Sequence, residues 1–232
     1  MNTRREELIE KKPLSDSIAS KLDQLLGNRT HFRVLEAGCG SASHVVLPSD
    51  IFMVGIDISG EQLAKNKTIQ EKILGDLQTY SLPANHFDIV ICWDVIEHLK
   101  DPVSALSNIF KSTKKGGVVV LAFPNVMSFK GLVTKFSPHW VHRSYYRMLN
   151  YASTPFETFL RFSIRPSNVA RLATLQGLSV EMSILYDGIP PGFKRRRVLY
   201  GIVKAVIGAL NAMTLFRYDL GQSDCVFIFK KI

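Results

Sequence analysis

Val34-Leu-Glu-Ala-Gly-Cys-Gly40 and Val54-Gly-Ile-Asp57 are the two stretches that decide the fold of this chain. In the first, a short apolar run ends in an acidic residue and two glycines, and in the second a similar run ends in an aspartate. Glycines at the carboxyl end of a parallel strand let the backbone approach a ligand closely. An aspartate that ends the next strand can accept hydrogen bonds from both hydroxyls of a ribose. The two stretches therefore predict a nucleotide-binding strand–loop unit.

Short apolar runs alternate with helix signals through the first half of the chain. The expected strands are Val34–Ala37, Phe52–Ile56, Phe87–Cys92 and Val118–Phe123. The expected helices are Leu14–Leu26, a segment from the capping box at Ser59 to about Ile73, and Asp101–Phe110, with Gly116 and Gly117 ending the connection after it. Continuous apolar strands that alternate with helices predict a parallel sheet covered on both faces.

The remaining segments are less regular. We expect residues 1–13 to be frayed, and a single turn or short loop between Gly40 and the second strand, because Pro48 lies in that short connection. Residues 124–165 are rich in aromatic and basic side chains and predict a mainly helical insertion. A helix at Ser167–Leu175 and strands at Leu178–Leu185 and Cys225–Lys230 follow.

Charge is distributed unevenly along the 232 residues, which carry a formal net charge of +9. Residues 1–127 hold 14 Lys and Arg against 15 Asp and Glu, a net of −1, whereas residues 128–232 hold 15 against 5, a net of +10. Any attraction for phosphate, carboxylate or an anionic surface therefore belongs to the second half.

The three cysteines, Cys39, Cys92 and Cys225, lie in or beside apolar runs without metal-ligand spacing. We therefore expect buried thiols in a reducing compartment, with no disulfide and no metal. Residues 1–12 are charged, with no apolar segment behind them, so we predict a cytoplasmic protein without a signal peptide.

Four segments, in this order, resemble the class I S-adenosylmethionine-dependent methyltransferases: Val34–Gly40, Gly55–Ser59, Gly75–Leu77 and Phe87–Leu99. Within that class the closest resemblance is to the "type 11" small-molecule branch that includes the quinone O-methyltransferases. It implies a Rossmann-like, doubly wound α/β fold with a mostly parallel seven-stranded sheet, an antiparallel last strand and helical insertions after strands 5 and 6. It also implies S-adenosyl-L-methionine as the cofactor.

We expect residues 1–232 to form a single methyltransferase domain. Its cofactor-binding core would comprise residues 14–125 and 166–186 together with 223–232. A substrate or lid insertion at 126–165 and an amphipathic basic insertion at 187–222 would interrupt that core.

The resemblance implies roles for the residues around the first two strands. Glu36, Gly38 and Gly40 would wrap the methionine portion and the ribose. Asp57 would hold the ribose hydroxyls, and Ile58 would lie against the adenine. The third glycine of the dinucleotide fingerprint is absent, which disfavours a pyrophosphate ligand.

Residues farther along the chain complete the implied cofactor site. Asp76 would accept a hydrogen bond from the adenine amino group, Leu77 would pack on the ring, and Trp93 would face the sulfonium end. Glu97 and His98 either pack at the start of the next helix or take part in the chemistry.

The methyl acceptor is predicted from its chemistry. When the acceptor is a hydroxyl, a histidine of near-neutral pKa suits proton removal, and His98, His139 and His142 are the candidates. The last two lie in an aromatic and basic cluster expected to form the acceptor pocket. That cluster comprises Trp140, Arg143, Tyr145, Tyr146 and Arg147. Its arginines would bind a substrate carboxylate or phosphate, so the substrate is expected to be small or lipid-like and anionic. The alternative is a packed aromatic lid.

The second insertion contains a basic run, Lys194–Arg197, followed by the mostly apolar segment Val198–Phe216. Lys204, near the centre of that segment, argues against a transmembrane span. We predict an amphipathic helix, so residues 194–216 form either an element at an anionic membrane surface or a gate for a hydrophobic substrate. A helix packed on the domain or in a homodimer interface is the alternative.

Three other functions stay open from the sequence. A nucleic-acid methyltransferase is disfavoured, because the usual Asn/Asp-Pro-Pro-Tyr type of motif is replaced by Cys92-Trp-Asp-Val95 and no RNA-binding module is present. A nicotinamide-dependent reductase is disfavoured by Ser43 at the third glycine position. A non-catalytic, cofactor-binding partner subunit fits the same motifs.

Overall fold

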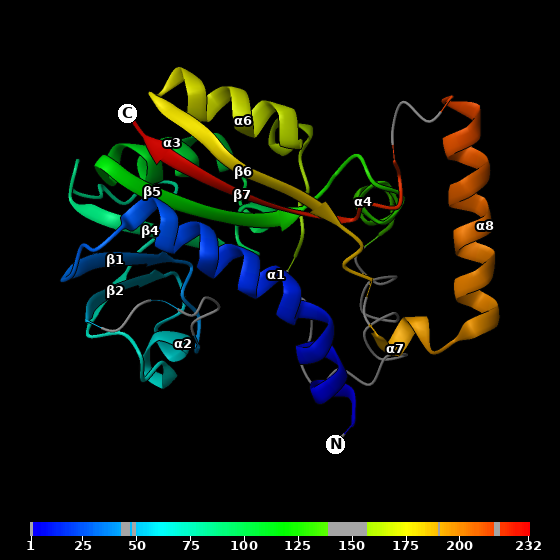
Figure 1. Ribbon diagram of the computed structural model, residues 1–232, viewed down its shortest axis with the longest axis horizontal. Helices are drawn as coiled ribbons and strands as arrows, with labels where there is room; N and C mark the ends of the chain where they lie inside the picture. Colours follow the sequence, from blue (N-terminus) through cyan, green and yellow to red (C-terminus); the bar gives the residue numbers. More distant parts are fainter. Residues whose placement is uncertain (1, 43–46, 48–49, 139–156, 190, 216–218) are drawn as a thin grey trace.

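The computed structural model describes residues 2–42, 47, 50–138, 157–189, 191–215 and 219–232. Seven strands form one sheet in the order β3-β2-β1-β4-β5-β7-β6 (Figure 1). The strands are β1 Phe32–Ala37, β2 Ile51–Asp57, β3 Glu71–Leu74, β4 Phe87–Trp93, β5 Thr113–Pro124, β6 Leu178–Tyr186 and β7 Asp224–Lys231. β7 runs antiparallel to both of its neighbours, and the other pairs are parallel. The predicted seven-stranded α/β sheet with an antiparallel last strand is confirmed.

Helices cover both faces of the sheet. The helices are α1 Asn2–Leu26, α2 Gly60–Lys65, α3 Pro102–Ser112, α4 Phe129–Phe136, α6 Pro166–Leu175, α7 Pro191–Lys194 and α8 Arg197–Met213, with 3₁₀ turns η1 Ile96–His98 and η2 Phe162–Ile164. Successive residues of a strand pack into two hydrophobic cores, one on each face of the sheet. Val34 and Ile91 pack with α1 and α2, whereas Leu35 and Val90 pack with α3 and α6. This alternation explains the continuous apolar runs, because a strand buried on both faces has no solvent side.

Two expected boundaries are wrong near the start of the chain and around β3. The predicted frayed start is helical from Asn2, since residues 4–12 are mainly good helix formers and Pro13 is accommodated inside α1. The helix capped by Ser59 ends at Lys65 rather than near Ile73, and residues 71–74 form β3 instead. Most of the predicted short connection before β2 lies outside the described residues.

The third difference concerns Gly116 and Gly117, which were expected to end a connection. They lie inside β5, which begins at Thr113, where the β4–β5 register shifts. A Cβ on Gly117 would lie 2.9 Å from the carbonyl oxygen of Asp88, so glycine allows the two strands to approach there.

The two insertions leave the sheet at the end toward which β5 points (Figure 1). The first contributes α4 and η2, and the second contributes α7 and α8, in agreement with the predicted helical insertions after strands 5 and 6. α8 stands beyond the end of the sheet and crosses the direction of the strands. Among the described residues, no helix combines the length and apolar character that a membrane crossing requires.

Candidate functional site

The loop after β1 is shaped by two glycines with left-handed backbone angles. Gly38 has φ +75° and Gly40 has φ +49°. A Cβ on Gly38 would overlap the side chain of Val95, which follows β4, so only glycine fits between the two strand ends. The amides of Gly38 and Cys39 both donate to the carbonyl of Ile56, at 2.8 and 3.2 Å. The loop is thus fixed against the carboxyl end of β2.

Asp57 joins this loop to the start of α2. Its Oδ2 accepts from the Gly40 amide at 2.9 Å, and its Oδ1 accepts from the Ser59 amide at 2.8 Å. Each oxygen of an ionised carboxylate has a second lone pair, so Asp57 keeps acceptor capacity for a diol. Ile58 beside it is 74% exposed, an apolar side chain available to the flat face of a ligand.

Asn66 is a member of this site that sequence reasoning missed. Its side-chain amide donates to the carbonyls of Cys39 and Gly40, at 3.2 and 3.3 Å, and it is buried. The only sequence signal was a polar residue directly after the α2 segment. The thiol of Cys39 is held neutral, because burial, with the charges of Asp57 and Glu36 adding to it, raises its pKa to about 12.

Asp76 follows β3 and is held in place by Gln78. Asp76 Oδ1 accepts from the Gln78 backbone amide at 2.9 Å, and the Gln78 side chain donates to both carboxylate oxygens. Gln78 Oε1 in turn accepts from the Asp101 amide at 2.7 Å. Leu77 is almost fully buried in the core on the α3 side, so a ligand reaches little of its surface.

The segment after β4 carries Trp93, Glu97 and His98. Trp93 is half-buried against the α1 side of the core, and Asp94 turns the chain with φ +52°. Glu97 is only 4% exposed, and its Oε2 has no hydrogen-bond partner among the described residues. Burial, reinforced by the charge of Asp94, raises the pKa of Glu97 well above its usual value. Its surroundings therefore favour the protonated form of this buried carboxyl group.

His98 contacts the first insertion. Its Nδ1 lies 2.8 Å from the carbonyl oxygen of Glu157, a contact that requires a proton on Nδ1. In the neutral ring Nε2 then carries a lone pair, and it lies 3.9 Å from Glu97 Oε1, beyond hydrogen-bonding distance.

The predicted acceptor pocket lies outside the described residues. It comprises His139, Trp140, His142, Arg143, Tyr145, Tyr146 and Arg147.

The structure does bring together the residues expected around the cofactor. They lie at the ends of β1, β2 and β4 and in the turn after β3, and His98 lies on the same edge of the sheet. Among the described residues, no three His, Cys, Asp or Glu side chains gather in a way that could hold a metal ion.

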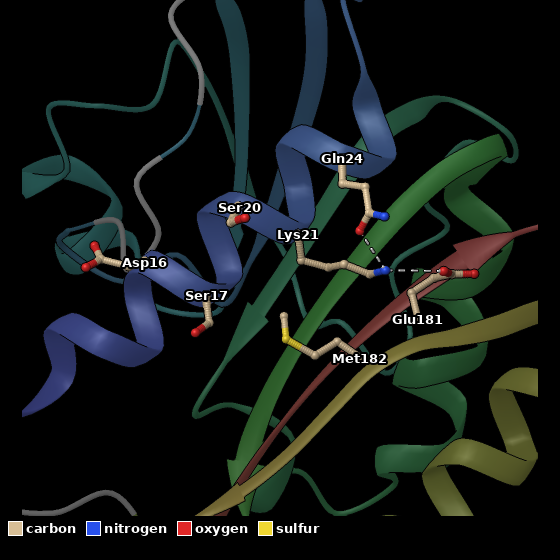
Figure 2. Close-up of a pocket in the computed structure, with 7 residues that line it drawn as sticks. All are labelled: Asp16, Ser17, Ser20, Lys21, Gln24, Glu181 and Met182. Carbon is tan, nitrogen blue, oxygen red and sulfur yellow. Dashed lines mark hydrogen bonds and ion pairs between the residues drawn. The ribbon is translucent and has the colours of Figure 1, made fainter.

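An open groove of about 550 Å³ lies elsewhere, between α1 and β6 (Figure 2). Lys21 crosses it, 3.1 Å from Gln24 Oε1 and 3.8 Å from Glu181 Oε2. Residues of α1 and β6 line it with both polar and apolar surface, and none of the residues expected around the cofactor contributes to it. We do not assign it a ligand.

The carboxylates at the strand ends match the functional groups of S-adenosylmethionine. Glu36, Asp57 and Asp76 bring carboxylates to the ends of β1 and β2 and to the turn after β3. Carboxylates suit ribose hydroxyls, an adenine amino group and the positive charges of an ammonium and a sulfonium, but repel a pyrophosphate. These three carboxylates therefore fit S-adenosylmethionine.

Comparison with known proteins agrees with this geometry. Residues 10–181 match the family described as a methyltransferase domain. A probable S-adenosylmethionine-dependent methyltransferase from Mycolicibacterium smegmatis is 32% identical over 101 residues, which are 41% of this chain and 39% of the relative. A ubiquinone biosynthesis O-methyltransferase from Nitrosomonas europaea is 25% identical over 168 residues, 68% of each chain. For the first two curated relatives the chain spans about two fifths of their length.

A solved structure extends the agreement to the whole fold. Magnesium protoporphyrin IX methyltransferase from Synechocystis, with bound SAH, superposes with a TM-score of 0.56 at 13% identity, covering 100% of this chain and 89% of that one. At this identity the likeness concerns the fold. The chain belongs to the class I S-adenosylmethionine-dependent methyltransferases, whose cofactor is S-adenosylmethionine.

Proposed function

We propose that this protein transfers a methyl group from S-adenosylmethionine to a hydroxyl or carboxyl of a small or lipid-like, anionic acceptor. The observation that carries the proposal is the position of Asp57, whose two oxygens hold Gly40 and Ser59 at the glycine loop. We propose the whole chain as one methyltransferase domain, with residues 126–165 as its substrate or lid insertion and residues 187–222 as its basic insertion.

The cofactor would be held by groups at the carboxyl edge of the sheet. Asp57 would accept from the ribose hydroxyls, while Glu36, Gly38 and Gly40 surround the methionine portion. Ile58 and Asp76 would bound the adenine, with Leu77 adding only the small part of its surface that is not buried, and Trp93 would lie at the sulfonium end. When bound, S-adenosylmethionine supplies an activated methyl group on a positively charged sulfur.

The acceptor would lie between this edge and the first insertion. His98 contacts the first insertion through the Glu157 carbonyl, and it would serve as the base that takes the proton a hydroxyl releases as it attacks. A carboxylate acceptor needs no base. His139 and His142 remain the alternative bases. Trp140, Tyr145 and Tyr146 would wall the acceptor, with Arg143 and Arg147 binding its anionic group.

Hydroxyl methylation is favoured by the relatives. The Nitrosomonas europaea protein is named a ubiquinone biosynthesis O-methyltransferase, and a relative from Coxiella burnetii, 27% identical over 155 residues, carries the same name. These names describe those proteins, and they lead us to propose the same atom, oxygen, for methylation by this chain.

The first prediction concerns Asp57. Replacing Asp57 by Asn keeps its size but removes the charge that both ribose hydroxyls need, so the affinity for S-adenosylhomocysteine should fall about 10- to 100-fold. Isothermal titration calorimetry measures this affinity. Asp50→Asn is the matched control, because Asp50 is exposed just before β2 and its side chain contacts only His31 among the described residues.

The outcome separates the competing functions. Unchanged affinity in Asp57→Asn would show that the site assignment is wrong, and binding of NAD by the parent protein would support the reductase. Labelled S-adenosylmethionine, supplied with lipid extracts, phenols, organic acids and RNA, then tests the acceptor. An alkali-stable product from a phenol or a lipid hydroxyl supports hydroxyl methylation. Labelled RNA supports the nucleic-acid alternative, and cofactor binding with no product in any class supports the partner subunit.

A further inference from the structure

α8 presents two different faces. The side chains at one face are buried or half-buried, and these are Tyr200, Val203, Ile207, Leu210, Asn211 and Thr214. The opposite face consists of exposed apolar residues at spacings of three and four, namely Val198, Ile202, Val206, Ala209 and Met213. Val198 and Met213, at the two ends, are each 80% exposed. The apolar stripe therefore runs the full length of α8, about 25 Å at 1.5 Å per residue.

The inward face holds α8 at both ends to the flanking segments of the second insertion. Near its start, the Tyr200 hydroxyl donates to Asp187 Oδ2 at 3.3 Å, and the Tyr200 ring meets Phe193 edge-on. Near its end, the Asn211 side chain accepts from the Leu220 amide at 3.0 Å and donates to Asp219 at 3.2 Å. These contacts fix the orientation of α8, which stands beyond the end of the sheet (Figure 1), and the apolar stripe lies on its exposed side.

Positive charge lies at the amino-terminal end of the apolar stripe. The run Lys194–Arg197 leads into α8, and its three arginines are exposed. Lys204 is also exposed, but it lies on the side of α8 that carries Tyr200, with its ammonium 6.0 Å from the centre of the Tyr200 ring. A helix with an exposed apolar face and a basic cluster next to it is the form that binds in the plane of an anionic bilayer surface.

We propose that α8 and the run Lys194–Arg197 form a docking surface for a bilayer containing anionic phospholipids. Charge selects this occupant over a second copy of the chain, because two copies meeting through α8 would bring together halves that each carry a net charge of +10. The helix lies on the membrane rather than across it, since Lys204 is central in its 17 residues. The proposal is independent of the proposed methyl transfer.

Co-sedimentation of the full chain with vesicles tests this docking surface. We expect binding to phosphatidylcholine vesicles that contain phosphatidylglycerol, little binding to phosphatidylcholine alone, and a weaker interaction at about 1 M salt than at about 0.1 M. Val206→Asp should lower the partition coefficient at least tenfold, because a charge enters the apolar stripe. Replacing Arg195, Arg196 and Arg197 by Gln should lower it about 100-fold.

Val103→Asp is the matched control. Val103 lies in α3 and is 40% exposed, against 41% for Val206 in α8, so both variants change the net charge and the exposed apolar area alike. Absence of binding to anionic vesicles by the parent would overturn the proposal, and so would an equal loss in Val103→Asp. A dimer in light scattering that Val206→Asp dissociates would also overturn it, by showing that a second copy covers α8. Far-ultraviolet circular dichroism checks that every variant is folded.

Discussion

Glu97 brings a carboxyl group into the core at the carboxyl end of β4, where solvent scarcely reaches it and Asp94 stands nearby. Its backbone carbonyl accepts from the amides of Phe159 and Leu160, at 2.9 and 3.2 Å, and so anchors the first insertion to η1. The side-chain Oε2, by contrast, has no hydrogen-bond partner in the described part of the chain. A buried polar atom without a partner costs stability, and such groups are often found at functional sites.

The raised pKa of Glu97 gives a prediction with a definite sign. Below the usual pKa of a glutamate both folded and unfolded chains are protonated, so the effect vanishes there. As pH rises above that value, the unfolded chain releases the proton first, and the folded protein loses stability. Glu97→Gln cannot ionise, so its stability relative to the parent should increase between pH 5 and pH 8, with a gain in Tm of a few degrees at pH 8.

Thermal unfolding of both proteins across this pH range measures the difference. Glu181→Gln, on β6 beside Lys21, is the control and should follow the parent at every pH. A difference between Glu97→Gln and the parent that stays constant from pH 5 to pH 8 would show that Glu97 is ionised in the folded protein.

Sequence patterns identify single residues only where the chemistry is local. Asp57 was found because it ends an apolar strand at a typical distance from the glycine loop. Asn66 could not be identified in this way, because its role depends on contacts with Cys39 and Gly40, which are 27 and 26 residues away in the sequence. Asparagine after a helical segment is common, and nothing in its neighbours specifies a distant carbonyl.

At the scale of elements, α2 shows how a tertiary contact overrides a helical pattern. Ser59 caps α2 as expected, accepting from the Gln62 amide at 3.3 Å. The helix nevertheless ends at Lys65, because Asn66 turns to the glycine loop and its Oδ1 accepts from the amide of Thr68 at 3.0 Å. The chain then extends into β3, where Glu71 pairs with Arg33 of β1 at 2.7 Å. These contacts are long-range, so a window of neighbouring residues cannot predict them.

Asn66→Ala tests whether this element positions the glycine loop. Loss of both loop contacts should lower the free energy of unfolding by about 1–3 kcal/mol. It should also weaken S-adenosylhomocysteine binding, because the loop carbonyls of Cys39 and Gly40 lose their donor. Urea unfolding and calorimetry measure the two effects.

The control for this element is Asn168→Ala. Asn168 is half-buried and donates to the carbonyl of Phe162 at 3.2 Å, so it also bonds a backbone oxygen, but at the start of α6. It should leave cofactor affinity unchanged. If Asn66→Ala lowers stability while affinity stays at the parent value, Asn66 supports the fold without positioning the loop.

For the whole molecule, the mostly parallel seven-stranded sheet, its antiparallel last strand and the two helical insertions could be predicted, because apolar runs and four ordered motifs define a common architecture. The placement of α8 could not, since its amphipathic pattern suits a membrane, a partner or the protein's own surface equally well. Only the fold shows which face of α8 turns inward, through Tyr200, Ile207 and Asn211. The contacts that Asp88 makes at the amino-terminal edge of the sheet were not predicted from the sequence either.

Asp88 organises that opposite edge. It is buried in β4, accepts from the Arg33 amide of β1 at 3.0 Å, and pairs with Arg29 at 2.6 Å and Lys114 of β5 at 2.8 Å. Burial acts to raise the pKa of Asp88, but the hydrogen bond from Lys114, the Arg33 amide and the neighbouring positive charges outweigh it and hold the pKa below its usual value. One carboxylate thus links three adjacent segments of the sheet.

Asp88→Asn should therefore lower the stability of the whole domain without touching the cofactor site. A carboxyl group with a depressed pKa stabilises the folded protein above its usual pKa, and that contribution is lost as pH falls. We expect the variant to lose about 1–2 kcal/mol of unfolding free energy at pH 7, because Arg29 and Lys114 are partly exposed and screened. The difference in unfolding free energy between the variant and the parent should narrow toward pH 3, and urea unfolding at several pH values measures it.

Asp23→Asn, at an exposed position on α1, serves as the control. S-adenosylhomocysteine affinity should be unchanged, since Asp88 lies at the end of β4 opposite Trp93. A loss of affinity as large as that in Asp57→Asn would instead mean that the two edges of the sheet are coupled.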